Sequence, residues 1–413
     1  VADIFNLRGS DIECNPVFFS YGLVTLSDAF LFINQEKLTK DAQRHLQEGE
    51  VKVLPYDQVS EAIQDLVSGL TRPQEEKTKR VWVSNKCSHA IAAMIPAQKT
   101  IAKVTPVALM KAVKNETERK GMRACHVRDG AALCRYLSWL QKEAPKGEQT
   151  ELSGAAVLEQ YRKEQDHYVG LSFSTISSSG PNSAIVHYSP SPQTDRKITT
   201  HEIYLVDSGG QYRDGTTDVT RTVHFGSPSE FEKECFTRVL KGHIAMATCI
   251  FPSKLKGNYL DTLARKFLWD VGLDYSHGTG HGVGMFLNVH EGPMQISWRP
   301  ALDDCGLDEG MFLSDEPGFY EDGKFGIRIE NIVEVVKAVT PHNHKGRGFV
   351  TFHSTTLAPI QTKLICPAML TTDEIDWLNA YHTRVLETVG ALLLKQGHKE
   401  AYDWLVEETR PIG

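Results

Sequence analysis

The sequence predicts an α/β (α+β) protein with two domains, and three observations support this. Short β-rich runs alternate with an amphipathic helical segment over residues 1–110. Two hairpin patterns that carry acidic residues follow in the second half of the chain. The chain has 413 residues, 41% hydrophobic and 23% charged, which is typical of a globular protein with more than one domain.

Composition excludes several classes of function. The net charge is -7 and the pI is near 6.2, so nothing indicates a nucleic acid or an anionic membrane as partner. No apolar run reaches the roughly 18 residues that a membrane span requires. The eight cysteines are scattered without a CxxC pair, which favours free thiols in a reducing compartment. We therefore expect a cytoplasmic protein, although the glycosylation triplet at Asn115 would also suit a secreted one.

A smaller α/β domain is expected over residues 1–115. Its predicted strands lie at residues 17–26, 29–33, 51–54 and 81–84, and a helix is predicted at 59–70. The polar, proline-containing segment 105–119 is interpreted as the link to the second domain. The chain starts without a methionine and inside what reads as a folded element, so we expect this domain to be incomplete at its N-terminus.

The larger domain is expected over residues 116–413. Helices are predicted at residues 121–144, 151–165, 227–248, 259–271, 372–395 and 399–408. For the third of these, Ser227 is the expected N-cap, Pro228 takes the first position and Glu230 completes a capping box.

The densest group of polar and small residues starts at His277. Three histidines (His277, His281 and His290) and four glycines fall within fourteen positions. Imidazole is a common metal ligand and proton carrier, and glycine permits close approach of the backbone. The pattern fits a site for an ion and a substrate, with the glycines keeping the loop thin enough for a peptide. It also fits a glycine-rich loop with incidental histidines, and acidic residues elsewhere decide between these interpretations.

The first acidic pair lies in a hairpin pattern over residues 202–225. A turn between Tyr212 and Arg213 would place Asp207 opposite Asp218, with Cβ atoms about 5 Å apart. Two carboxylates at that separation repel each other unless a cation lies between them, or unless each is solvated. Asp207 follows an apolar run that resembles a buried strand, and a buried charge needs a partner.

A second hairpin pattern, over residues 311–333, repeats this arrangement. A turn centred at Gly323 places Glu316 opposite Glu330, and His281 lies between the two hairpins in sequence. Four carboxylates with one imidazole differ from the closed Cys/His sets of structural zinc. They suit harder divalent ions such as Mn²⁺, and shared carboxylates can bridge two ions roughly 3.5–4 Å apart. Such a pair hydrolyses amides or esters.

These five residues and the sequence around them resemble the pita-bread metallopeptidases (M24), which include methionine aminopeptidase, prolidase and Xaa-Pro aminopeptidase. The matching runs are residues 207–221, 277–284, 290–293 and 326–331, and they look most like the eukaryotic three-domain aminopeptidase P group. The resemblance implies a C-terminal pita-bread (creatinase/aminopeptidase) catalytic domain after a creatinase-N-like domain. It implies two divalent ions, with Mn²⁺ expected and Zn²⁺ or Co²⁺ as alternatives. The implied ligands are Asp207, Asp218, His281, Glu316 and Glu330.

The resemblance also implies roles for residues that do not bind metal. His187 would lie over the substrate near the scissile bond, and His277 and His290 would bind substrate and help proton transfer. Arg328 would lie beside the metal site and contact substrate, and Glu316 would also act as general base or proton shuttle. Each has a structural alternative: a core histidine, a loop cap, or an arginine that only pairs with a carboxylate.

The implied activity is a metal-dependent aminopeptidase. It would release the N-terminal residue from Xaa-Pro-Yaa peptides through attack by a hydroxide that bridges the two metals. The resemblance further suggests a homodimer joined through the catalytic domain. Two alternatives stay open: a prolidase that cleaves Xaa-Pro dipeptides, and a non-catalytic pita-bread protein that binds peptides or proteins. The presence of all five ligands argues against the second.

Overall fold

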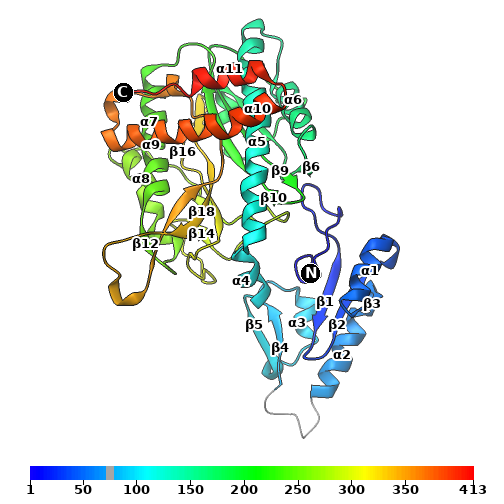
Figure 1. The fold of residues 1–413 in the computed structure, drawn as a ribbon. Helices are drawn as coiled ribbons and strands as arrows, with labels where there is room; N and C mark the ends of the chain where they lie inside the picture. The colour runs from blue at the N-terminus through cyan, green and yellow to red at the C-terminus, as the bar shows by residue number, and fades with distance from the viewer. Residues whose placement is uncertain (71–78) are drawn as a thin grey trace. The chain divides into compact units, whose positions relative to one another are not determined.

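The computed structural model describes residues 1–70 and 79–413, which divide into two units, Val1–Lys111 and Ala112–Gly413 (Figure 1). Both units mix helices and strands, as the sequence predicts. Among the described residues, none of the helices is long and apolar enough to cross a membrane.

The first unit contains two small sheets. Strand β2 (Ala29–Ile33) pairs antiparallel with β1 (Ser20–Val24) and parallel with β3 (Val51–Pro55), while β4 (Val81–Ser84) pairs parallel with β5 (Thr100–Lys103). The helices are α1 (Lys40–Glu48), α2 (Val59–Leu70), α3 (His89–Ala93) and α4 (Pro106–Ala112). Successive side chains of β2 point to opposite faces of its sheet, and both faces are packed. Leu31 and Ile33 pack against Leu46 of α1, and Phe32 packs with Val59 and Ile63 of α2.

The boundary between the two units, after Lys111, falls within residues 105–119, which the sequence pattern indicates as the link, but the stretch is largely helical. This stretch holds α4 and the start of the long helix α5 (Glu116–Glu143). The Thr105 hydroxyl accepts a hydrogen bond from the backbone N–H of Ala108, and Pro106 occupies the first helical position, where its missing N–H costs nothing. Asn115 then begins α5 through a capping box with Glu118.

Two sheets form the centre of the second unit. One has the order β11 (Val219–His224), β8 (Ile203–Ser208), β7 (Ile176–Ser179). The other has the order β12 (Phe251–Pro252), β19 (Phe349–Ser354), β18 (Asn331–Lys337), β15 (Phe312–Asp315). Smaller ladders join β6 (Tyr168–Leu171), β9 (Gly210–Tyr212) and β10 (Gly215–Thr216), then β13 (Gly280–His281) with β14 (Gln295–Ile296), and β16 (Gly318–Glu321) with β17 (Phe325–Arg328).

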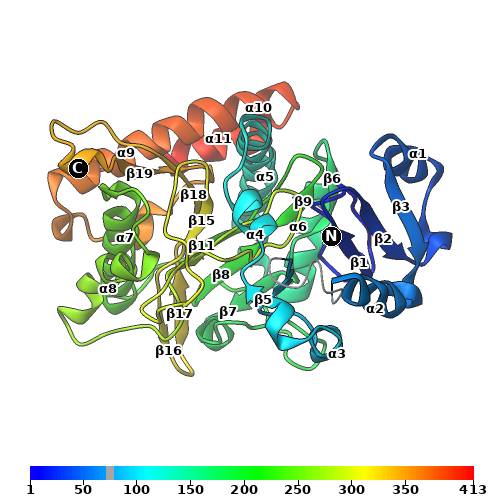
Figure 2. The same cartoon turned by 90° about the horizontal axis from the view of Figure 1, so that it is seen from below.

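Helices cover these strands (Figure 2). Helix α5 and helix α6 (Glu151–Lys163) pack on the first sheet, where Leu137 and Leu158 share a core with Tyr204 and Val206. A second core joins α7 (Glu230–Thr248) and α8 (Asp261–Trp269) to α9 (Thr372–Val385), α10 (Ala391–Lys395) and α11 (Lys399–Glu408).

The start of α7 differs from the prediction. The N-cap is Ser229 and not Ser227, and the capping box is closed by Glu232 and not Glu230. The sequence contains two overlapping Ser-x-x-Glu patterns, and the second is used because Ser229 and Glu232 exchange hydrogen bonds with each other's backbone N–H.

Candidate active site

One cavity of about 570 Å³ gathers the residues that the sequence singles out. Its lining includes Asp207, Asp218, His281, Glu316, Glu330, His187, His277, His290 and Arg328. These residues come from segments spread over more than a hundred positions of sequence, so the fold brings them together.

The sequence predicts that Asp207 lies directly opposite Asp218, and the structure differs. The ladder pairs Asp207 with Thr220, because Tyr212 pairs with Gly215 and the turn is one residue later than expected. This turn packs tightly on α5: a Cβ on Gly121 would lie 2.3 Å from the carbonyl oxygen of Asp214. A turn moved by one residue shifts the pairing by two and leaves side chains on the same face, so the two aspartates are diagonal neighbours on one face.

The second hairpin has the predicted register. Asp315 pairs with Asn331 on one side and Gly318 with Arg328 on the other, which puts Glu316 opposite Glu330. The same face carries Arg328 opposite Gly318 and Tyr320 opposite Gly326, so each large polar side chain has a glycine across from it.

One ring nitrogen of His281 is held by the backbone, and the other faces two of the carboxylates. Its Nδ1 lies 3.1 Å from the carbonyl oxygen of Gly282 and donates to it, so the Nε2 lone pair is free. Nε2 lies 3.4 Å from Oδ2 of Asp218 and 3.5 Å from Oε1 of Glu316. The Ser314 hydroxyl accepts from the His281 backbone N–H and donates to Glu316, which fixes both residues relative to each other.

The glycines around His281 have a different reason from the one the sequence suggested. A Cβ on Gly280 would lie 2.0 Å from the carbonyl oxygen of Ser314, and one on Gly282 would lie 2.1 Å from that of Glu291. Two backbone segments of the protein itself lie against the loop on these sides. The glycines at these two positions therefore serve internal packing, where the expectation was clearance for a peptide.

Burial and mutual repulsion disfavour the charged forms of the carboxylates in the cavity. Burial raises the pKa of Asp218 well above its usual range, and the nearby carboxylates of Asp207 and Glu316 raise it further. Burial likewise raises the pKa of Glu330 well above normal, with Asp218 and Asp207 adding to the effect, and it also raises the pKa of Glu316. A buried cluster of this kind is stabilised when it takes up protons or binds cations.

The donor set fits divalent metal ions. Ligand atoms of Asp218, His281 and Glu330 all lie within 4.8 Å of one another. Asp207 and Glu316 line the same cavity from the neighbouring strand positions. Oxygen donors with one imidazole match the preferences of Mn²⁺ and related ions, and they differ from the thiolate-rich sets of structural zinc.

Arg328 connects the two hairpins from a buried position. Its guanidinium donates to Oδ2 of Asp207 at 2.7 Å, to the Tyr320 hydroxyl at 2.7 Å and to the Thr220 hydroxyl at 3.0 Å. Thr220 in turn donates to Glu330 at 2.8 Å. Each of the three nitrogens of Arg328 thus contacts protein, and this geometry supports an organising role for the side chain.

The three cavity histidines other than His281 differ in how many neighbours hold their rings. His277 has both ring nitrogens engaged, with the carbonyl oxygen of Gly278 at 2.8 Å and the Tyr320 hydroxyl at 2.9 Å. Burial lowers its pKa to about 3, so its ring is neutral near pH 7. His290 packs its ring against that of His281 with centroids 4.1 Å apart, and burial lowers its pKa to about 4. His187 is exposed at the cavity.

Sequence reasoning missed Tyr320, Thr220 and Ser314. The signal for Tyr320 was present, because it lies on the same hairpin face as Glu316, four positions on, and the predicted register already put it there. Thr220 and Ser314 gave no signal, since hydroxyl residues are common in strands and their partners are distant in sequence.

Three protein-family models together match most of the chain. The Creatinase/Prolidase N-terminal domain matches residues 1–118, metallopeptidase family M24 matches residues 120–337, and the C-terminal region of peptidase M24 matches residues 348–412. These matches confirm the predicted fold class, with a pita-bread catalytic domain after a creatinase-type N-terminal domain.

Proteins similar to this chain over its whole length are named more specifically than the family models. Xaa-Pro aminopeptidase ApepP of Drosophila melanogaster is 50% identical over 415 residues, which cover 100% of this chain and 67% of the relative. A probable Xaa-Pro aminopeptidase P of Coprinopsis cinerea is 49% identical over 100% of this chain and 67% of its own length.

A solved structure agrees with these relatives. The X-prolyl aminopeptidase of Caenorhabditis elegans, described as a cytosolic enzyme with a di-nuclear active site, superposes with a TM-score of 0.94 at 42% identity. The match covers 99% of this chain and 66% of that one, so the present chain spans about two thirds of the length of its relatives. The chain belongs to metallopeptidase family M24, and within it to the Xaa-Pro aminopeptidases.

Proposed function

We propose that this protein is a metal-dependent exopeptidase that removes the N-terminal residue from peptides with proline in second position. The observation that carries the proposal is one cavity lined by four carboxylates and four histidines, in a chain whose relatives are named for this activity. The free N-terminal amine of a substrate would approach the carboxylates, since opposite charges attract in a cavity of low dielectric.

We propose that two divalent ions bind Asp207, Asp218, His281, Glu316 and Glu330, with Mn²⁺ as the physiological metal. The di-nuclear site described for the Caenorhabditis elegans enzyme and the oxygen-rich donor set support this assignment. Such ions supply a hydroxide at neutral pH and polarise the scissile carbonyl group.

The protein's own residues would handle the protons. Glu316, which lines the cavity, would take a proton from the attacking oxygen and pass it to the leaving nitrogen. That nitrogen belongs to proline, and it needs a proton before it departs. His290 would contact the substrate from beside His281, and exposed His187 would contact it from the cavity rim. Phe173, Ile176 and Val289 supply apolar lining that would exclude water.

Elemental analysis combined with peptide hydrolysis tests the proposal. The purified protein should contain about two divalent ions per chain, and it should release free arginine from Arg-Pro-Pro. Exchange of the bound ions for Mn²⁺, Zn²⁺ or Co²⁺ should give the highest turnover with Mn²⁺. Chelated protein should lose activity and regain it when the metal is restored.

Other outcomes would redirect the assignment. Faster hydrolysis of Arg-Pro than of Arg-Pro-Pro would indicate a prolidase, and tight peptide binding without cleavage by metal-loaded protein would indicate a non-catalytic binding protein. A homodimer and a cytosolic location belong to the same proposal, and sedimentation and cell fractionation test them.

A further inference from the structure

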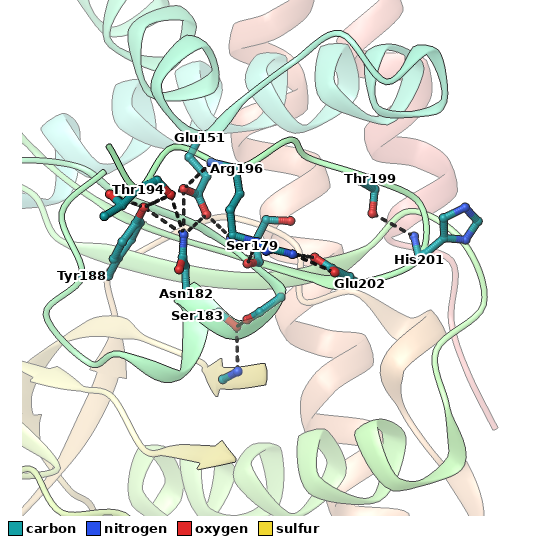
Figure 3. A network of polar contacts seen from close by, with 12 residues as sticks. Glu151, Ser179, Asn182, Ser183, Tyr188, Thr194, Arg196, Thr199, His201 and Glu202 are labelled. Atoms are coloured by element: carbon teal, nitrogen blue, oxygen red, sulfur yellow. Dashed lines mark hydrogen bonds and ion pairs between the residues drawn. The ribbon is translucent and has the colours of Figure 1, made fainter. Parts of the chain in front are cut away.

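A buried carboxylate lies apart from the metal-binding cluster and is surrounded by donors. Glu151, at the start of α6, is fully buried. It accepts hydrogen bonds from the backbone N–H of Ser179 at 2.7 Å, the Asn182 amide at 3.0 and 3.1 Å, and the Tyr188 hydroxyl at 2.7 Å (Figure 3). It also accepts from the backbone N–H of Arg196 at 3.0 Å. A buried charge with this many partners is held in place strongly.

All of these donors belong to, or directly precede, one segment, residues 180–202, which we call the His187 segment. It leaves β7 through a 3-10 turn at Gly180–Ala184 and runs to β8 without further helix or strand. His187 lies in it between Asn182 and Tyr188, and Glu151 binds the side chains of both. The carboxylate therefore holds the segment on both sides of His187.

The same segment is also held at its ends. Arg196 donates to both carboxylate oxygens of Glu202 at 2.8 Å, and a Cβ on Gly180 would lie 2.2 Å from one of those oxygens. The Ser183 hydroxyl accepts from the backbone N–H of Gly326 at 2.6 Å, which joins the segment to β17, the strand that carries Arg328. In Figure 3 these contacts lie along the whole segment, from Ser183 to Glu202.

His187 differs in exposure from Tyr188, the next residue. Tyr188 is buried, whereas His187 is exposed and lines the cavity. A loop histidine keeps one position only if the backbone around it is fixed, because exposed side chains and loops otherwise move freely. The anchors on either side of His187 are the contacts to Glu151.

We propose that Glu151 is a positioning residue for peptide cleavage: it fixes the His187 segment so that His187 contacts the bound peptide. This inference rests on the proposed function, because it assumes that His187 contacts substrate. Glu151 does not touch the cavity, so its effect on turnover runs through His187. The expected loss on removing the carboxylate is about 10- to 100-fold in kcat/KM, as for other misplacements of about 1 Å.

The variant Glu151→Gln tests the positioning directly. Replacing one oxygen with an NH₂ group places a donor against donors, since Glu151 is the acceptor in each of the hydrogen bonds described above. Glu159→Gln is the matched control, because Glu159 lies on the same helix with its carboxylate paired to Lys163 near the surface. Amide hydrogen exchange over residues 180–202 should quicken in Glu151→Gln and stay unchanged in Glu159→Gln. Unchanged exchange in Glu151→Gln would overturn the proposal without reference to activity.

A double-mutant cycle separates positioning from general destabilisation. In the wild-type background Glu151→Gln should lower kcat/KM for Arg-Pro-Pro, with metal content unchanged. In a His187→Ala background the same change should cost less than about twofold, because the residue it positions is already gone. Equal losses in both backgrounds would overturn the proposal.

Two further outcomes are distinguishable. If Glu151→Gln does not fold, Tyr188→Phe removes one of the anchoring hydrogen bonds and takes its place in both experiments, with the same outcomes expected. If wild-type protein loaded with metal cleaves no Xaa-Pro peptide, the proposed function fails, and the catalytic part of this inference fails with it. The exchange experiment still decides whether Glu151 holds the segment.

Discussion

Arg328 donates a 2.7 Å hydrogen bond to Asp207, and its side chain is 2% exposed. The pair lies among three more carboxylates, those of Asp218, Glu316 and Glu330. The guanidinium therefore reduces the repulsion within the cluster and fixes the orientation of Asp207 at the same time.

Replacing Arg328 with methionine should destabilise the protein most when metal is absent. Removing one partner of a buried ion pair costs about 3–5 kcal/mol, because the other charge stays buried and unpaired. Bound divalent ions would neutralise Asp207 in its place, so the cost should be smaller in metal-loaded protein. Chemical unfolding with and without chelator measures both values.

Arg328→Lys is the control for charge alone. Lysine keeps the positive charge but cannot reach Asp207, Tyr320 and Thr220 together, so an intermediate loss is expected. Equal destabilisation of the metal-free and metal-loaded forms by Arg328→Met would contradict the compensating role described for the guanidinium.

His281→Ala and Glu316→Ala should abolish turnover mainly through loss of metal. Each removes one of the proposed ligands, and loss of even a supporting residue around a metal typically costs about 10- to 100-fold, so the loss here should be larger. Elemental analysis and kcat for Arg-Pro-Pro are measured on the same samples. Glu321→Ala is the control, since Glu321 lies in the same hairpin and pairs with Lys324 near the surface.

The dinuclear assignment has a clear failing outcome. A Glu316→Ala protein that contains no metal and retains full activity would rule it out. Normal metal content with no activity would instead move Glu316 from metal binding to proton transfer.

Tyr320→Phe should leave the metal content unchanged and reduce stability. The hydroxyl accepts from Arg328 at 2.7 Å and lies 2.9 Å from Nε2 of His277, so its loss leaves two buried polar groups without a partner. The expected cost is about 1–3 kcal/mol, read from urea unfolding. Since Arg328 and His277 line the cavity, kcat/KM should also fall, by about tenfold for a barrier change of about 1.4 kcal/mol.

A suitable control for Tyr320→Phe lies elsewhere on the chain. Tyr402→Phe, on α11, alters a half-buried tyrosine away from the cavity and should change neither quantity. If both variants behave alike, the hydroxyl of Tyr320 has no special part in the site.

The two hairpins show how far sequence determines the site. The register of the second was predictable because Gly323 marks its turn, and the pairing of Glu316 with Glu330 follows from counting. The register of the first was not, because its turn lies one residue later than the pattern suggests. The turn packs Asp214 against Gly121 of α5, a contact between segments far apart in the chain that no local pattern reveals. A register error of two residues leaves each side chain on the same face of the sheet. The predicted placement of both aspartates on one face therefore holds in spite of the wrong pairing, and both line the cavity.

Local sequence pattern predicts the helices better than it predicts the contacts that support the site. The bounds of α2 and α11 match the predicted residues because apolar spacing and end signals coincide there. Helix α1 was missed because its residues are polar and only Leu46 is buried. Glu151 could be predicted as the start of a helix, but its partners lie 28 to 45 positions away, and no local pattern reveals them.

Stability should fall as the pH drops below about 6.5, and His382 should contribute to this fall. Its ring is buried, its Nε2 accepts from the backbone N–H of Ile360 at 3.1 Å, and burial lowers its pKa from 6.5 to about 4. Because the folded pKa lies below the unfolded one, the unfolded chain takes up a proton first. The neutral ring thus stabilises the fold above about pH 6.5, and this contribution is lost as the pH falls towards 4.

His382→Gln keeps an acceptor for the Ile360 N–H but does not titrate. Between about pH 4.5 and 6 the unfolding free energy of wild type should fall by up to about 1.4 kcal/mol per pH unit more than that of the variant. Urea unfolding of both proteins in chelator measures this difference, and the carboxylates of the cavity contribute equally to both. Parallel pH profiles would show that His382 is already protonated in the folded protein or that it titrates alike in both states.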